Sequence, residues 1–108
     1  MTVSTHVLDA NAGRPAAGVA VSLSRLAARD TWLPAGCGVT DAGGRFRFTG
    51  ETAAGVYRVT FGTGSYFAAR GVRTFYPEVV ITFTIGDDGH YHVPLLLSPF
   101  AYSTYRGS

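Results

Sequence analysis

Short runs in which hydrophobic and polar residues alternate recur along this chain, and a period of two is typical of half-buried β-strands. The clearest run is Arg45–Thr49, where Phe46 and Phe48 should point inward and both arginines outward. The other expected strands cover Val3–Asp9, Val19–Ser24, Thr31–Leu33 with a resumption at Cys37–Thr40, Tyr57–Phe61, Val79–Ile85, Tyr91–Leu97 and a short segment after Ser98-Pro99.

Turn-forming residues separate these runs at hairpin spacing. One helix is expected, a turn or two over Ser65–Arg70, because Gly64 and Gly71 flank that segment. Many short strands with so little helix favour an all-β sandwich of about seven or eight strands, and we expect a single domain over residues 1–108. The expected turns and loops are Asp9–Pro15, Ala27–Asp30, Asp41–Gly44, Gly50–Gly55 and Asp87–Gly89.

The strand expected at Tyr91–Leu97 is hydrophobic on both faces. Its core face would carry Tyr91, Val93, Leu95 and Leu97, and its other face His92, Pro94 and Leu96. The outer face of an antiparallel sandwich normally meets water, so the apolar character of this face predicts that something further covers it. His92 would then lie in the covered region.

Composition and charge exclude several classes of protein. The net charge of +2 is spread along 108 residues without a basic run, so nucleic-acid binding is not expected. All nine basic residues are arginine, which leaves no lysine for a Schiff base or an isopeptide bond. Cys37 is alone, so no disulfide can form within the chain, and a reducing compartment fits. Neither a signal peptide nor a bilayer-spanning run is visible, and we expect a cytoplasmic protein without membrane contact.

Three polar side chains stand out by strand parity: His6 in the middle of its strand, Arg45 at the start of its strand, and His92 on the apolar outer face. Each has a structural alternative, because strand histidines are often hydrogen-bonded structural residues and outward arginines are usually solvated, as we expect for Arg47. Together, two imidazoles can divide proton acceptance and donation, and a guanidinium can hold a planar, electron-rich ligand. This set suits the addition of water to a polarised carbonyl.

Two further chemistries are not expected. No serine lies on a nucleophile elbow, which argues against Ser-His-Asp catalysis. No His, Cys or carboxylate cluster has ligand spacing, so no metal site is predicted. His90 is expected at the edge of the turn after Gly89, on the strand face opposite to His92.

The chain resembles the transthyretin-related 5-hydroxyisourate hydrolases over essentially its whole length. The residues that carry the resemblance are Thr5-His6-Val7-Leu8-Asp9, the turn from Thr40-Asp41 to Gly44-Arg45, Tyr91-His92-Val93-Pro94-Leu95-Leu96-Leu97-Ser98-Pro99, and Tyr102-Ser103-Thr104-Tyr105-Arg106-Gly107-Ser108. The closing Tyr-Arg-Gly-Ser is the most specific of them, since the family ends on it.

The resemblance implies a transthyretin-like β-sandwich of two four-stranded sheets with one short helix. It also implies a homotetramer, a dimer of dimers, whose active sites lie at the dimer–dimer interface. The implied reaction is opening of the six-membered ring of 5-hydroxyisourate, a cyclic amide hydrolysis in urate degradation that needs no cofactor or metal. The catalytic residues implied are His6, Arg45 and His92, with Tyr105 and Ser108 also binding substrate; which histidine is the general base is left open.

Two alternatives share parts of this pattern. Transthyretin, a non-enzymatic small-molecule carrier, has the same fold but carries lysine, glutamate and threonine where this chain has His6, Arg45 and His92, and it lacks the Tyr-Arg-Gly-Ser ending. A structural or binding β-sandwich of the carboxypeptidase-regulatory or collagen-adhesin type shares only the strand–turn–strand pattern of Gly18–Leu23 followed by Thr40–Phe46. Nothing in that class requires His92 or a polar C-terminal tetrapeptide.

Overall fold

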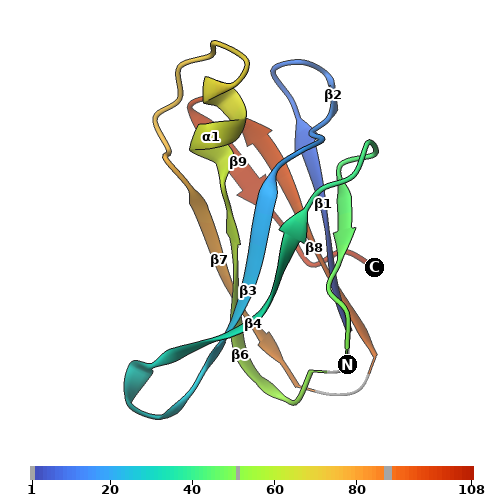
Figure 1. Cartoon of the computed structure of the whole chain (residues 1–108). Coiled ribbons are helices and arrows are strands. Elements are labelled where there is room, and N and C mark those ends of the chain that lie inside the picture. The colour runs from blue at the N-terminus through green and yellow to red at the C-terminus, as the bar shows by residue number, and fades with distance from the viewer. Residues whose placement is uncertain (1, 51, 87–88) are drawn as a thin grey trace.

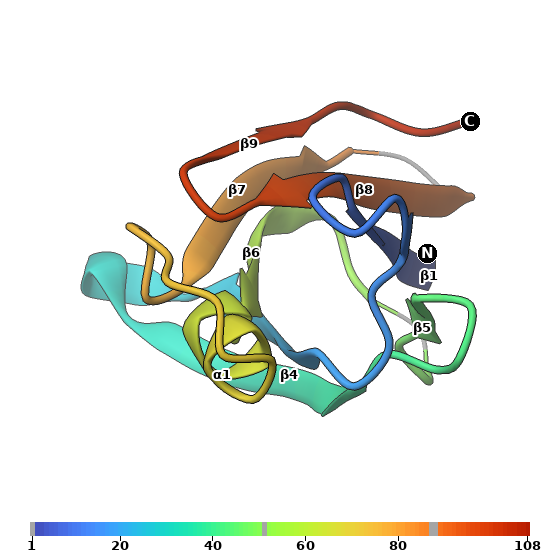
Figure 2. The same ribbon diagram turned by 90° about the horizontal axis from the view of Figure 1, so that it is seen from above.

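The computed structural model describes residues 2–50, 52–86 and 89–108, and this part consists of two facing β-sheets with one short α-helix and a 3-10 turn, η1 (Ala28–Asp30) (Figures 1 and 2). The predicted all-β sandwich is therefore confirmed, whereas part of the expected Asp87–Gly89 turn lies outside the described residues. The first sheet contains β1 (Thr2–Asp9), β2 (Arg14–Pro15), β5 (Arg45–Arg47), β8 (His90–Ser98) and β9 (Ala101–Thr104). The second contains β3 (Ala20–Leu26), β4 (Trp32–Val39), β6 (Gly55–Phe61) and β7 (Val79–Ile85).

The first sheet is organised around β1, which pairs in parallel with β8 along its whole length, from Thr2 opposite His90 to Asp9 opposite Leu97. The other edge of β1 is shared by two short strands, β2 near Asp9 and β5 near His6. The sheet is thus four strands wide although five segments build it, in the order β2/β5, β1, β8, β9. The second sheet is antiparallel throughout, in the order β4, β3, β6, β7.

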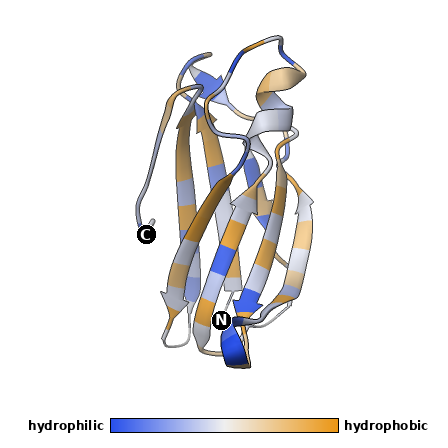
Figure 3. Cartoon of the chain, turned by 90° about the vertical axis from the view of Figure 1, so that its left-hand side faces the viewer, coloured by the Kyte–Doolittle hydropathy of each residue, from blue (hydrophilic) through white to orange (hydrophobic). Residues whose placement is uncertain are grey.

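The core lies between the sheets, and strand parity decides which side chains enter it (Figure 3). On β1 every second residue is buried, and on β8 the predicted core residues Tyr91, Val93, Leu95 and Leu97 are all buried. Pro94, predicted to face outward, is buried as well, whereas Leu96 is 36% exposed. The outer face of β8 is therefore already partly covered within a single chain.

Three elements differ from the sequence prediction. The helix α1 covers Thr63–Ala68 rather than Ser65–Arg70, and it begins right after β6. The strand that was predicted to be interrupted between Leu33 and Cys37 is continuous as β4. Its pairing with β3 shifts by one residue between Leu23 and Ser24, so the two strands stay paired on both sides of the shift. Arg14–Pro15, predicted as turn, forms the two-residue strand β2.

The strand β7 is less buried than its alternation predicts. Val79 and Ile85 at its ends are buried, but Ile81 and Phe83 in its middle are only half-buried. The core is consequently open along this edge of the sandwich.

The helix is tied to β1 by a buried polar contact. Tyr66 Oη donates a hydrogen bond of 2.7 Å to Asp9 Oδ2, and the backbone N–H of Ala12 donates to Asp9 Oδ1 at 2.9 Å. Burial and the bond to Asp9 raise the pKa of Tyr66 to about 12, so the phenol stays a donor at neutral pH. Since a buried carboxylate needs such partners, this contact holds the end of β1 against the helix. No helix among the described residues is long and apolar enough to cross a membrane.

Candidate functional site

The three candidate residues meet on the outer face of the first sheet. His6 lies directly opposite Arg45 across the β1–β5 pair, and directly opposite Pro94 across the β1–β8 pair. Ser4, two residues before His6 on the same face, lies opposite His92. The sheet therefore places His6, Arg45 and His92 on one face, where His6 and Arg45 are near enough to act on the charge of His92.

The imidazole of His6 is held by the neighbouring turn. Its Nε2 lies 2.9 Å from the carbonyl oxygen of Gly43. A carbonyl oxygen can only accept a hydrogen bond, so Nε2 carries the proton. The other ring nitrogen, Nδ1, is left to exchange a proton with a ligand on the outer face.

The turn that holds His6 also begins the strand of Arg45. Asp41 Oδ1 accepts hydrogen bonds from the backbone N–H groups of Gly43 and Arg45, each at 2.9 Å. Gly44 has φ +75°, and a Cβ there would collide with the backbone oxygen of Val7 on β1. Only glycine fits this left-handed position against the strand. The Asp-Ala-Gly-Gly turn therefore sets the positions of both His6 and Arg45.

His92 is half-buried, and its electrostatic surroundings disfavour the charged form. Burial, followed by the positive charges of His90, His6 and Arg45, lowers the pKa of His92 below its ordinary value of 6.5. The ring is therefore neutral at pH 7. Its Nδ1 lies 2.7 Å from Ser4 Oγ, which leaves Nε2 free for a ligand.

His90 was predicted to lie on the face opposite His92, and this was wrong. Residues two apart on a strand point to the same face, and the two rings stack with centroids 6.4 Å apart. His90 Nε2 lies 2.7 Å from the same Ser4 hydroxyl, and His90 Nδ1 lies 2.6 Å from Thr2 Oγ1. The prediction missed Ser4 as well; its parity with His6 could have indicated it, but its pairing with β8 is not visible in sequence.

The tail after β9 runs along the outer side of β8 (Figure 2). The backbone N–H of Gly107 donates to the His92 carbonyl oxygen at 2.9 Å, and the two residues form a β-bridge. A Cβ on Gly107 would lie 2.5 Å from His92 Cδ2, so the tail touches the His92 side chain closely. Tyr105, 60% exposed, and Ser108, also exposed, flank this contact.

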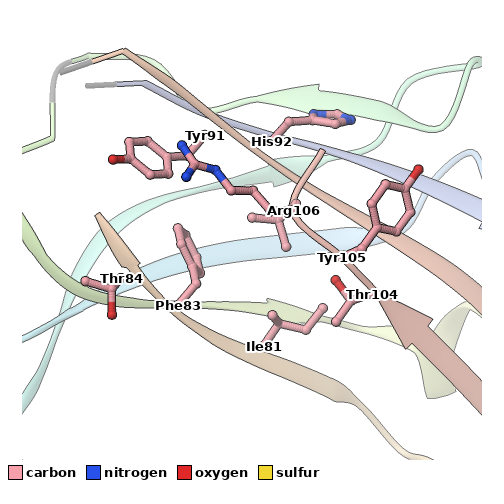
Figure 4. Close-up of a pocket in the computed structure, with 9 residues that line it drawn as sticks. Ile81, Phe83, Thr84, Tyr91, His92, Thr104, Tyr105 and Arg106 are labelled. Carbon is pink, nitrogen blue, oxygen red and sulfur yellow. The ribbon is translucent and has the colours of Figure 1, made fainter. Parts of the chain in front are cut away.

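A cavity of about 360 Å³ lies between β7, β8 and the tail, and its lining includes His92, Tyr105 and Arg106. Figure 4 shows Arg106 reaching toward Tyr91 above Phe83, while the His92 ring points away to the opposite side. The Arg106 guanidinium lies 4.7 Å from the centre of the Tyr91 ring. The tail thus alternates between the two sides of the sheet, with Arg106 on the core side and Gly107 beside His92.

This arrangement can perform hydrolysis with protein groups alone. Arg45 offers a guanidinium at the start of a strand held by Asp41, His92 offers a neutral ring whose Nδ1 is bonded to Ser4, and His6 offers a ring whose Nε2 is bonded to Gly43. Within the described residues, no three His, Cys, Asp or Glu side chains are grouped so that they could hold a metal ion.

Comparison with known proteins gives a consistent family. The HIUase/Transthyretin family profile matches residues 3–107. The 5-hydroxyisourate hydrolase of Salmonella dublin is 47% identical over 111 residues, covering 98% of this chain and 80% of the relative. That of Mus musculus is 41% identical over 111 residues, covering 98% of this chain and 94% of the relative.

Solved structures of two kinds match the fold. The 5-hydroxyisourate hydrolase of Klebsiella pneumoniae has a TM-score of 0.90 at 43% identity and covers 100% of both chains. Sea bream transthyretin in complex with thyroxine has a TM-score of 0.93 at 37% identity, covering 97% of this chain and 93% of that one. Backbone similarity alone therefore does not distinguish a hydrolase from a transthyretin, so the distinction must come from the side chains on the outer face of the first sheet.

Proposed function

Because the chain belongs to the HIUase/Transthyretin family, we propose that it is a 5-hydroxyisourate hydrolase. The reaction opens the six-membered ring of 5-hydroxyisourate at a cyclic amide and yields 2-oxo-4-hydroxy-4-carboxy-5-ureidoimidazoline. The observation that carries the proposal is the convergence of His6, Arg45 and His92 on one face of the first sheet. A carrier that only binds its ligand has no need of two imidazoles and a guanidinium at one point.

In this mechanism Arg45 binds the carbonyl or anionic edge of the substrate and neutralises the negative charge that develops on oxygen as water adds. His92 is the proton acceptor, since its lowered pKa keeps it neutral and its Nε2 is free. His6 supports the departing ring nitrogen from Nδ1: with Nε2–H bonded to the Gly43 carbonyl, the ring takes up a proton from solvent at Nδ1 and passes that proton to the departing nitrogen.

The tail from Tyr105 to Ser108 closes the site. Gly107 is paired beside His92, so the flanking Tyr105 and Ser108 are well located to contact substrate and exclude bulk water. No metal or organic cofactor enters this mechanism, because protein groups supply both the proton transfers and the charge stabilisation.

The active assembly is a homotetramer in which a second subunit covers the outer face of the first sheet. Leu96 is exposed on this face, in line with His92 on β8. An uncovered apolar face beside a catalytic site is typical of an interface between subunits. A reducing compartment such as the cytoplasm suits Cys37, which is exposed and unpaired.

The test is ultraviolet monitoring of freshly made 5-hydroxyisourate with and without the protein, because the compound also decays spontaneously. We expect clear acceleration, and a loss of at least about 100-fold in His6→Asn, Arg45→Gln and His92→Asn. Arg47→Gln is the matched control, since Arg47 is an exposed arginine with the same parity on the same strand. A rate equal to spontaneous decay for the unmodified protein would refute the hydrolase.

The alternative is a transthyretin-type carrier, which the match to sea bream transthyretin favours. It predicts tight binding of thyroxine without hydrolysis of 5-hydroxyisourate. Isothermal titration with thyroxine, run beside the rate assay, separates the two functions.

A further inference from the structure

We propose that Ser4 and His90 are positioning residues that act through His92, forming a hydrogen-bonded relay that removes the proton His92 accepts. The inference rests on the proposed function for its catalytic consequence. The relay itself consists of contacts among four side chains, and these can be tested without substrate.

The relay is continuous from the outer surface to the site. Thr2 Oγ1 lies 2.6 Å from His90 Nδ1, His90 Nε2 lies 2.7 Å from Ser4 Oγ, and Ser4 Oγ lies 2.7 Å from His92 Nδ1. All three separations are in the range of hydrogen bonds. His90 is exposed, whereas Ser4 and His92 are half-buried. One end of the relay therefore meets solvent and the other faces the substrate side.

The Ser4 hydroxyl couples the two rings because it has a single proton. It can donate to only one histidine, so it must accept from the other. If His92 Nδ1–H donates to Ser4, then Ser4 donates to His90 Nε2, and His92 Nε2 carries a lone pair. If Ser4 donates to His92 Nδ1, then His90 Nε2–H donates to Ser4, and His92 Nε2 carries the proton. The tautomers of two neutral rings are thus linked.

This coupling lets His92 accept a proton without remaining charged. Water adds to the substrate carbonyl and gives a proton to His92 Nε2, while the Nδ1–H bond of His92 breaks and its proton passes to Ser4. Ser4 passes its own proton to His90 Nε2, and the Nδ1 proton of His90 leaves through Thr2 to solvent. One proton enters at His92 and one departs at the surface, so every ring ends neutral.

The charges around His92 favour this outward transfer. The groups that act on its charge are His90 on β8, His6 on β1 and Arg45 on β5, each positive or able to become so. Arg47 lies opposite Ser4 across the β1–β5 pair. The tail adds the uncharged Gly107 at His92, while Arg106 is directed to Tyr91. A proton left on His92 would be surrounded by cationic groups, and its exit to exposed His90 relieves that repulsion.

The decisive measurement is the nitrogen chemical shifts of the imidazoles by two-dimensional NMR over a pH titration, without substrate. In the unmodified protein we expect the nitrogen shifts of the two neutral rings to match one of the two linked tautomer arrangements, with the protonated nitrogen of His92 set by that of His90. In Ser4→Ala this link between the tautomers should be lost, and Ser4→Thr, which keeps the hydroxyl, should restore it. In His90→Gln the His92 titration should move up toward its ordinary value of about 6.5, because one positive neighbour is removed.

Kinetics give the second readout. Ser4→Ala and His90→Gln should each lower kcat about tenfold to 100-fold with little change in KM, since neither side chain touches substrate. Ser24→Ala is the matched control, because Ser24 is a half-buried serine on the other sheet. Thermal melting of each variant separates a fold defect from a relay defect.

Unchanged nitrogen shifts of His92 in both Ser4→Ala and His90→Gln would overturn the relay, whatever the rates are. A protein that shows the linked tautomers but does not accelerate 5-hydroxyisourate decay would instead refute the hydrolase alone, with the relay retained as a structural feature. Tautomers of His90 and His92 that do not depend on Ser4 in an active hydrolase would refute the relay alone.

Discussion

Substituting Gly107 with alanine should inactivate the site without loosening the fold. The added Cβ would lie 2.5 Å from Cδ2, 3.1 Å from Cγ and 3.2 Å from Cβ of His92. Carbon atoms in contact prefer separations of about 3.5–4.0 Å, so the tail or the imidazole has to move by roughly 1 Å. A misplacement of about 1 Å at a catalytic group costs on the order of 100-fold in rate. Gly107 has no left-handed φ, so backbone strain adds nothing.

The same substitution should barely affect stability. Residues 101–106 and 108 are exposed and Gly107 is half-buried, so no core volume changes. The largest expected loss is the hydrogen bond from Gly107 to the His92 carbonyl, about 0.5–1.5 kcal/mol. The melting temperature should therefore fall by no more than a few degrees.

The assay compares kcat/KM for 5-hydroxyisourate with the melting temperature for Gly107→Ala. Gly86→Ala is the control, because Gly86 also lacks a left-handed φ and a Cβ there meets nothing within 4 Å. The reasoning about the tail is wrong if Gly107→Ala keeps its full rate. It is equally wrong if rate and melting temperature collapse together, since the tail would then be part of the core.

Three further outcomes are expected. Asp41→Ala removes the acceptor of the Gly43 and Arg45 backbone N–H groups, so kcat should fall at least tenfold, and Asp41→Asn, which keeps an acceptor oxygen, should recover most of it. The pKa of His92 is lowered in the folded state, so the unfolded state binds more protons as pH falls through about 6.5. The free energy of unfolding, measured by chemical denaturation, should therefore decrease as pH falls through that value. The decrease should be smaller in His92→Gln. Leu96→Glu would bury an unpaired charge if a second subunit covers the outer face, so sedimentation should show smaller species and the rate assay lost activity; an active monomer of the parent protein would contradict the interface.

Parity along single strands was enough to predict on which face much of the candidate site lies. His6 and Arg45 were identified as outward residues, and the alternation of β8 correctly separated its core residues from His92. These inferences succeed because the side-chain period of a strand is a local property of the backbone. The turn at Asp41–Gly44 was equally visible, since it depends on residues adjacent in sequence.

What the sequence did not reveal depends on pairing between distant strands. Ser4 became a candidate only when β1 was seen to lie parallel to β8, which puts it opposite His92. The error over His90 was one of parity rather than of pairing: two residues apart means the same face. Pro94 was expected on the outer face, where another subunit would cover it, but it is buried within the single chain. The alternation of residues along one strand does not show which other segments of the chain pack on its outer face.

The parallel pairing of β1 with β8 has a consequence for how the protein acquires its activity. The contacts Thr2–His90 and Ser4–His92 join residues 88 apart in sequence, and closing such a distance costs chain entropy before any contact compensates for it. β1 cannot complete its sheet until β8 exists, so a nascent chain exposes a central strand with one bare edge. Catalytic competence should thus arise late and all at once during refolding, and the interval before it is when this protein is most prone to aggregate.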